Sequence, residues 1–343
     1  MKKVDYNPHS LPFFKSLKVQ KLQDSLSKNE KKTFINGLYG SAKSFFVKEL
    51  YRNKKQTIFW ILNDKESAAY HYNDLENFMD DSDCCFFIGS YKRNKEFDKT
   101  DSQNIFMRTE IIKNLSLNKK SKIIVSYPEA IFEKVLIKKE IGKRILKLSK
   151  GEKIELENLN EKLFEYDFNR VDFVSEPGDF SVRGGIIDIF TSGPNKAVRL
   201  DFFGDTIDKL RTFDVISQLS INNLEKIQLL PISEIVINEE TVKNFRGNFR
   251  KKFGVFGNQN GLYASISEKR RVQGIEQWLP LFYDNLESLF DYLPDANYFL
   301  DQDIKNDLLT RWDNINSQFC TRTSSINKRS KQVNLSWCDP KTL

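Results

Sequence analysis

The segment from residue 166 to residue 234 constrains the fold of this chain more than any other part. Short apolar runs at residues 186–190, 198–203 and 227–230 are each bounded by turn-forming Gly, Pro, Asn or Asp. Such runs are typical of consecutive β-strands. The pattern predicts a compact α+β domain with antiparallel hairpins. The hairpins are expected at Gly178, Gly184 with Gly185, Pro194 with Asn195, and Gly204.

The first third of the chain has a different pattern, in which apolar strand-like runs alternate with helical segments. Strands are expected at residues 32–36, 57–62, 84–88 and 122–126, and helices follow the first three of them. This alternation predicts a parallel α/β sheet with helices on its faces. The character changes after Pro128, so we place domain boundaries to give residues 1–130, 131–216 and 217–343. We expect the chain to return to the first domain after the middle one.

The sequence GLYGSAKS follows the first expected strand and departs at one position from the phosphate-binding pattern G-x-x-x-x-G-K-[ST]. Ala42 stands where the last glycine is required, and its methyl group crowds the approach of an anion to the backbone. No apolar run ends in the paired Asp-Glu that would hold Mg²⁺. A weakened nucleotide site remains an alternative to a turn kept for packing, but we expect no ATP hydrolysis. The degenerate loop consists of Gly37, Gly40, Ser41, Ala42, Lys43 and Ser44.

Composition narrows the class of protein. The 343 residues, 39% of them hydrophobic, suffice for two or three domains, and the net charge of +7 would suit an anionic partner. The lysines are scattered, however, and no charge stripe identifies such a partner. Four Cys and two His give neither a disulfide framework nor metal-ligand spacing, so no metal is expected. Since no signal peptide or long apolar run is visible, a cytoplasmic location is expected.

Taken together, these motifs resemble the UvrB-like N-terminal module of the bacterial transcription-repair coupling factors, the Mfd family. Residues 166–234 resemble the second domain of that module, GLYGSA resembles its decayed phosphate loop, and residues 274–294 resemble its domain 1b signature. The resemblance implies a degenerate P-loop, RecA-like domain (1a plus 1b) with an inserted α+β antiparallel domain (2). One departure is Leu219, where the family usually has a basic residue.

The resemblance also implies a role. In the family, domain 2 docks the damage-recognition protein UvrA, and the matching contact residues here are Arg170, Arg183, Phe180 and Phe173. The module would be non-catalytic, with no cofactor of its own. ATP and Mg²⁺ would serve motor domains elsewhere in a longer protein, which would also bind RNA polymerase and DNA. No membrane contact is expected.

Other interpretations of the same residues remain open. The arginines, with Arg199 and Arg211 also spaced through the segment, would in the simplest case pair locally with Asp172, Glu176 or Asp188. Asp188, Asp201 and Asp205 are expected to be solvent-facing. A different function would be a UvrB-like, nucleotide-dependent protein that binds damaged DNA, which would need an intact phosphate loop. An unrelated phosphate-binding α/β enzyme is a third possibility, although no nucleophile and base occur at a readable spacing.

Overall fold

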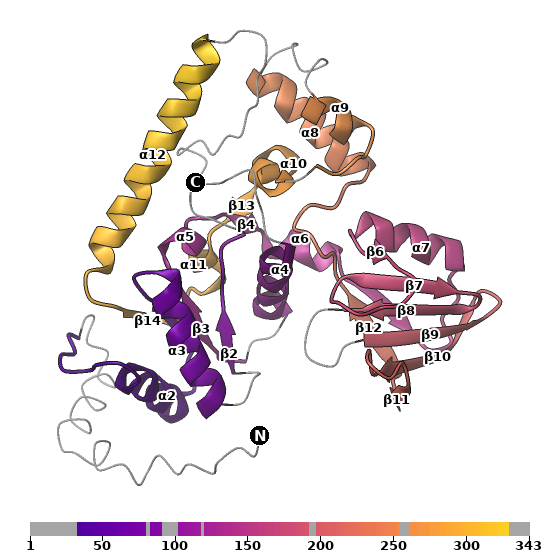
Figure 1. Cartoon of the computed structure of the whole chain (residues 1–343), viewed down its shortest axis with the longest axis horizontal. Coiled ribbons are helices and arrows are strands. Elements are labelled where there is room, and N and C mark those ends of the chain that lie inside the picture. The colour runs from indigo at the N-terminus through magenta and orange to yellow at the C-terminus, as the bar shows by residue number, and fades with distance from the viewer. Residues whose placement is uncertain are drawn as a thin grey trace. The chain divides into compact units, whose positions relative to one another are not determined.

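The structure is a computed structural model that describes residues 33–79, 83–90, 102–117, 120–191, 197–253, 261–272 and 274–328. The chain divides into two compact units, each with its own main sheet (Figure 1). The first unit contains the described residues up to Phe86, together with Lys120–Tyr127 and Asp295–Ile304. The second unit contains the other described residues.

The sheet of the first unit is parallel throughout and has the order β14-β1-β3-β2. Every side chain of β1 and β3 is buried, as expected for parallel strands that are covered on both faces. Strand β14 comes from far along the sequence and pairs with β1. These features confirm the predicted α/β class. The strands are β1 (Ile58–Ile61), β2 (Cys84–Phe86), β3 (Ile123–Ser126) and β14 (Asn297–Leu300).

Two helices of this unit frame the phosphate-loop sequence. Helix α2 (Ala42–Lys54) begins inside it, and α3 (Lys65–Phe78) follows β1. The Asp64 carboxylate caps α3 by accepting a hydrogen bond from the Ser67 amide at 2.7 Å. The strand expected at residues 32–36 is wrong for its described part, because residues 33–36 have no regular structure. The Phe34 side chain there is 90% exposed and does not enter the core.

The main sheet of the second unit has the order β11-β10-β9-β8-β7-β6, and its neighbours are antiparallel except for β6 and β7. Gly184 and Gly204 open the two-residue turns β7–β8 and β9–β10, with φ of 59° and 58°, which glycine adopts without strain. These two predicted hairpins are confirmed, whereas Pro194 and Asn195 lie outside the described residues. The strands are β6 (Asn169–Arg170), β7 (Asp179–Arg183), β8 (Ile186–Phe190), β9 (Ala197–Phe203), β10 (Thr206–Phe213) and β11 (Ser220–Asn223).

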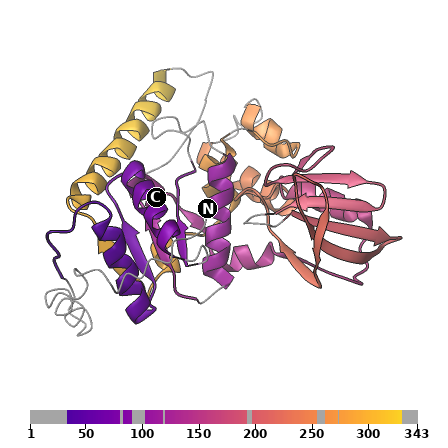
Figure 2. The same cartoon turned by 60° about the horizontal axis from the view of Figure 1, so that its bottom comes forward.

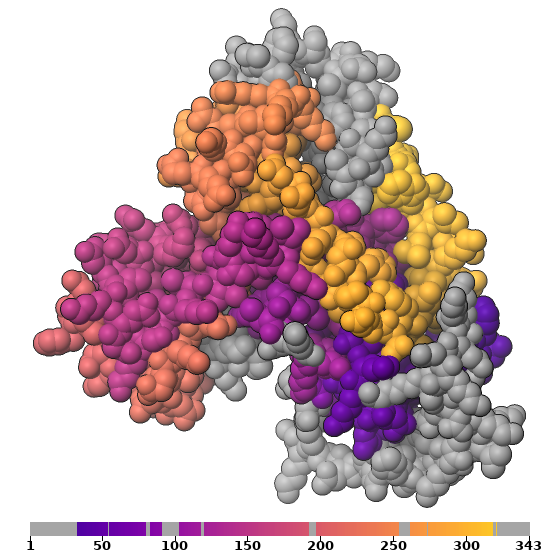
Figure 3. Space-filling model, turned by 180° about the vertical axis from the view of Figure 1, so that it is seen from behind, coloured from indigo at the N-terminus to yellow at the C-terminus, as the bar shows by residue number. Residues whose placement is uncertain are grey.

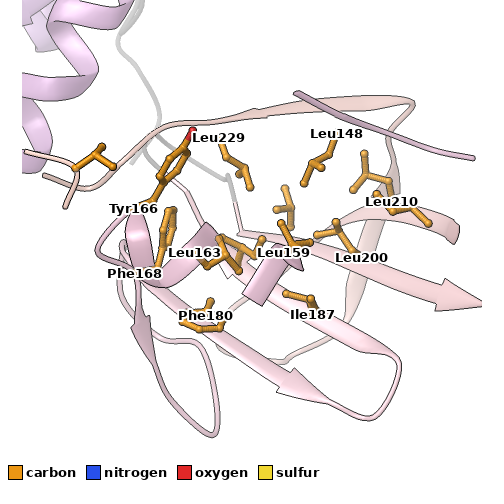
Figure 4. Packing of buried hydrophobic residues seen from close by; sticks show 14 residues of the cluster. Leu148, Leu159, Leu163, Tyr166, Phe168, Phe180, Ile187, Leu200, Leu210 and Leu229 are labelled. Carbon is orange, nitrogen blue, oxygen red and sulfur yellow. The ribbon is translucent and has the colours of Figure 1, made fainter. Parts of the chain in front are cut away.

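Helix α7 (Leu156–Glu165) covers one face of this sheet (Figures 1 and 2). Leu159 and Leu163, both fully buried, point from the helix toward the sheet (Figure 4). A two-stranded ladder of β5 (Leu146–Ser149) and β12 (Lys226–Leu229) contributes to the same core. The residues that they meet include Phe180, Ile187, Leu200, Leu210 and Leu229.

The remainder of the second unit is mainly helical. Phe245 and Phe249 of α8 lie against Phe282 of α10 and Tyr263 of α9, with ring centroids 4.8 Å and 5.3 Å apart. No helix among the described residues is long and apolar enough to cross a membrane. The elements are α4 (Ser102–Leu117), α5 (Pro128–Ile131), β4 (Val135–Leu136), α6 (Lys138–Lys143), α8 (Glu239–Phe253), α9 (Gly261–Ser267), η3 (Ile275–Trp278), α10 (Leu279–Phe282), β13 (Leu286–Glu287), α11 (Leu289–Tyr292) and α12 (Ile304–Lys328).

Arg108 of α4 is a fully buried cation within this unit. Its Nε donates to Glu234 Oε1 at 3.1 Å, and its Nη1 lies 3.4 Å from Glu133 Oε2. The guanidinium also stacks on Phe87, 4.5 Å from the ring centroid. Burial raises the pKa of Glu133, although Arg108 and the hydrogen bonds from Ser90 act in the opposite direction. Buried charges in this cluster therefore connect three segments that are distant in the sequence, around residues 108, 133 and 234.

Candidate functional site

The six-stranded sheet has one face in the core and one face lined by charged side chains. Phe180 and Val182 of β7 pack into the core below α7. Because side chains alternate along a strand, Ser181 and Arg183 lie on the other face. Pairing extends that face to Asp188 of β8, opposite Ser181, and to Arg199 of β9, opposite Asp188. Residues spread over three strands therefore meet on one surface.

Asp188 clamps two arginines on this face. Asp188 Oδ1 accepts from Arg199 Nε at 2.7 Å, and Asp188 Oδ2 accepts from Arg199 Nη2 at 2.9 Å. Arg183 Nη2 also donates to Asp188 Oδ2. The hydrogen bonds to Asp188 raise the pKa of Arg199. Asp188 is fully buried, so the expectation that it faces solvent is wrong, since two guanidiniums cover it. The local pairing considered for Arg183 is confirmed.

A second ion pair and an exposed ring extend the same surface. Arg211 of β10, opposite Arg199, donates to Asp201. Phe173 is 64% exposed, and the Arg183 guanidinium lies 5.0 Å from the centroid of its ring. We call Arg183, Arg199, Arg211 and Phe173 the arginine face. Its guanidiniums are held at fixed positions, and the Arg183 side chain remains 36% exposed, so the face offers directional donors to a carboxylate-bearing partner.

Arg170 does not share the arginine face. It pairs in register with Phe180, whereas its neighbour Asn169 pairs with Asp179. Paired residues project from the same side of a sheet, so Arg170 lies on the side of Phe180 and α7. An Asn169 to Asp179 hydrogen bond of 3.4 Å supports this register. The two arginines expected on one surface thus lie on opposite faces, near the β6 edge.

Burial decides the position of one further expected contact residue, Phe180. Phe180 has no exposed surface and packs edge-on against Phe164, with ring centroids 5.2 Å apart. It belongs to the core and is not available to a partner, in contrast to the expectation. Asp205 is exposed as expected, whereas Asp201 pairs with Arg211. Leu219, which replaces the family's basic residue, is 68% exposed.

The phosphate-loop sequence forms a turn whose polar groups are already bonded. Lys43 Nζ lies 2.5 Å from Asp301 Oδ1, at the end of β14. The Ala42 and Lys43 amides donate to the Tyr39 and Gly40 carbonyls at 3.2 Å and 3.1 Å. In a working loop the lysine and these amides would face phosphate oxygens. Here the lysine is paired with a carboxylate of the protein, and the two amides are bonded to backbone carbonyls.

Ser44, the residue that would bind Mg²⁺ in a working loop, is fully buried. Its hydroxyl donates to Asp74 Oδ2 at 2.8 Å and lies 2.7 Å from His71 Nδ1. Desolvation is the main cause that lowers the pKa of His71, and the nearby positive charge of Lys43 lowers it further, so the neutral ring is favoured. Ser41 is bonded to Tyr70 at 2.7 Å. The loop side chains are thus used within the first unit.

The sequence reasoning missed Asp301 and Asp74 as partners of the loop. No local signal marks Asp301, which follows Lys43 by 258 positions. The strand–turn sequence at residues 297–301 was the available clue, because the carboxyl end of a parallel strand faces the loops at that edge. Asp188 was considered as a local partner of an arginine and otherwise as a solvent-facing position. It lies between two apolar residues whose side chains fill the core face.

Comparison with known proteins shows what the sequence resembles. Residues 146–235, which hold the sheet, α7 and the β5–β12 ladder, match the UvrB interaction domain family. The middle of the chain is therefore similar to UvrB interaction domains. The protein is also 32% identical over 289 residues to a transcription-repair-coupling factor of Rickettsia typhi. The matched region covers 84% of this chain and 26% of that relative.

Two further relatives carry the same description. A transcription-repair-coupling factor of Bacillus subtilis is 29% identical over 287 residues, covering 79% of this chain and 24% of the relative. The transcription-repair-coupling factor of Escherichia coli K12 is 37% identical over 156 residues, covering 45% of this chain and 14% of the relative. The resemblance predicted from the sequence is thereby confirmed. The chain spans about a quarter of the length of the first relatives it matches.

Proposed function

We propose that this chain is a non-catalytic recruitment module that binds UvrA and so couples transcription to nucleotide excision repair. The UvrB interaction domain and the relatives named transcription-repair-coupling factors support this role. The observation that carries it is the arginine face, where Asp188 holds Arg183 and Arg199 side by side at the surface. RNA polymerase, and the DNA on which motor domains act, would be engaged by other parts of a longer protein.

The docking partner is proposed to cover the β6 edge of the sheet. Arg183 and Phe173 would meet it from one face, and Arg170 would reach it from the other. Interface centres favour arginine and aromatic side chains for such contacts. Arg183, which is held by Asp188 and stacks on Phe173, is assigned the central contact. Arg170, which is exposed on the two-residue edge strand, is assigned to the rim.

The arrangement of domains is part of this proposal. A RecA-like domain (1a plus 1b) would carry domain 2 as an insertion. The expected boundaries 131–216 would then move to about residues 146–235, the span of the family match. The packing of β12 against β5, which places residues 226–229 in the core of the UvrB interaction domain, supports the later end.

Replacement of Arg183 by Glu is expected to weaken UvrA binding by about thirtyfold or more, the usual effect at an interface hot spot of about 2 kcal/mol. Arg170→Glu is expected to weaken it about three- to tenfold, as a rim charge does. Binding would be measured by surface-attached UvrA and the full chain in solution. Lys226→Glu, an exposed charge reversal on β12, is the matched control and should change little. Unaltered affinity of the Arg183→Glu protein would refute the proposed surface.

The loop is proposed to be inactive toward nucleotides because its lysine, hydroxyl and amides are bonded within the protein. Calorimetric titration with ATP and Mg²⁺ should therefore show no binding heat. Lys43→Ala should instead lower the free energy of unfolding by about 1 kcal/mol, since it removes a partly buried ion pair. ATP turnover that disappears in the Lys43→Ala protein would show that the loop still works, and would favour the UvrB-like alternative.

A further inference from the structure

Helix α8 carries a cationic stripe on its outer side. Val242, Phe245 and Phe249 are buried, whereas Lys243, Arg246, Gly247, Arg250 and Lys251 are exposed. Residues three and four positions apart lie above one another on a helix, so Lys243, Arg246 and Arg250 form one row. Figure 3 shows the orange segment that contains α8 at the molecular surface.

These cations have no acidic partner among the residues that the structure describes. The ion pairs of those residues include none with Lys243, Arg246, Arg250 or Lys251. Glu239, in the first turn of the helix, pairs instead with Lys269 at 2.5 Å. Like charges one turn apart repel each other and destabilise a helix. The row therefore carries a repulsion that a bound anion would relieve.

The two arginines are positioned by the protein rather than left free. Arg246 Nε donates to the Tyr263 hydroxyl at 3.4 Å, and the Arg250 guanidinium lies 5.7 Å from the centroid of the same ring. Burial raises the pKa of Tyr263, but hydrogen bonds and charges from Arg246 and Arg250 outweigh it and lower the pKa. One buried ring thus fixes two guanidiniums on adjacent turns, which reduces the entropy lost when they bind a ligand.

We propose that the outer face of α8 binds the phosphate backbone of duplex DNA. A row of cations at one-turn spacing meets successive phosphates without reading sequence. A membrane is a poor fit, because an interfacial helix must bury its apolar face in lipid, and that face of α8 is already buried against Phe282 and Tyr263. An acidic protein is also a poor fit, because no large apolar side chain on the exposed face of α8 would anchor it.

The test is fluorescence anisotropy of a labelled random-sequence duplex with the full chain at several salt concentrations. We expect binding whose affinity falls steeply between about 50 and 200 mM salt. The triple variant Lys243→Glu, Arg246→Glu, Arg250→Glu should weaken binding at least tenfold or so and lower the salt slope by about 3. The matched control is Lys147→Glu, Lys150→Glu, Lys226→Glu, three exposed lysines in or next to the β5–β12 ladder, which should bind nearly as the unaltered chain does.

Further arms separate the ligand classes. Arg246→Lys with Arg250→Lys should keep most of the DNA affinity, because a phosphate accepts either cation. Polyglutamate and phosphatidylserine vesicles should compete weakly. The proposal is overturned if the unaltered chain does not bind the duplex at low salt, if the triple variant binds like its control, or if either competitor binds α8 better than DNA. UvrA binding should be unchanged in the triple variant, so the outcome is independent of the proposed recruitment function.

Discussion

Replacement of Arg108 by Met is expected to lower the free energy of unfolding by about 3–5 kcal/mol. Methionine fills much of the space but leaves the Glu133 and Glu234 carboxylates buried without their shared cation. Uncompensated buried charge is among the few single-residue changes with so large an effect. Urea unfolding followed by circular dichroism of the full chain would measure it.

The loss should also depend on pH. The folded-state pKa of Glu133 is raised by burial, so this group favours folding below its ordinary pKa of 4.5 and opposes it as pH rises through the folded value. Arg108 holds that pKa down, and its removal raises the pKa further. The Arg108→Met loss should thus be larger at about pH 8 than at about pH 5. Lys162→Met, at a cation paired with the similarly exposed Glu165, is the control and should cost less than about 1 kcal/mol at both values. Equal losses for the two variants would contradict the buried-charge explanation.

The strands within residues 146–235 were predictable because local chemistry specifies them. In β8, Ile187 and Ile189 alternate with polar or half-buried residues, and glycines with positive φ close the adjoining hairpins. Apolar alternation and turn residues act over a few positions, so a single sequence records them. The buried strands β1 and β3 were equally visible as continuous apolar runs.

The arrangement of the candidate site was less predictable because it depends on pairing between distant segments. Strand β6 has two residues, and its parallel register with β7 decides which face Arg170 occupies. Nothing within residues 169–170 specifies that register. Similarly, Asp188 looks like a solvent-facing strand position until Arg183 and Arg199 are brought over it from neighbouring strands. The sequence therefore indicated which residue types occur in the candidate site, but it did not predict the surface that they form.

Replacement of Asp188 by Ala is expected to have the largest effect on the arginine face. Stability should fall by about 3 kcal/mol, because a fully buried carboxylate that binds two guanidiniums is removed. UvrA affinity should also fall, by about tenfold, because Arg183 and Arg199 lose the group that fixes them before binding. Urea unfolding and UvrA binding of the same protein, the latter at a temperature where it is fully folded, would measure the two effects.

Asp201→Ala supplies the comparison on the same face. Within the part of the chain that the structure describes, Asp201 pairs with Arg211 alone, and its side chain is 18% exposed, so water replaces part of the lost interaction. We expect about 1 kcal/mol of lost stability and a smaller change in UvrA affinity. If Asp188→Ala lowered stability but left UvrA affinity at the unaltered value, the clamp would serve the fold alone. Recruitment would then depend on Arg183 without its fixed orientation.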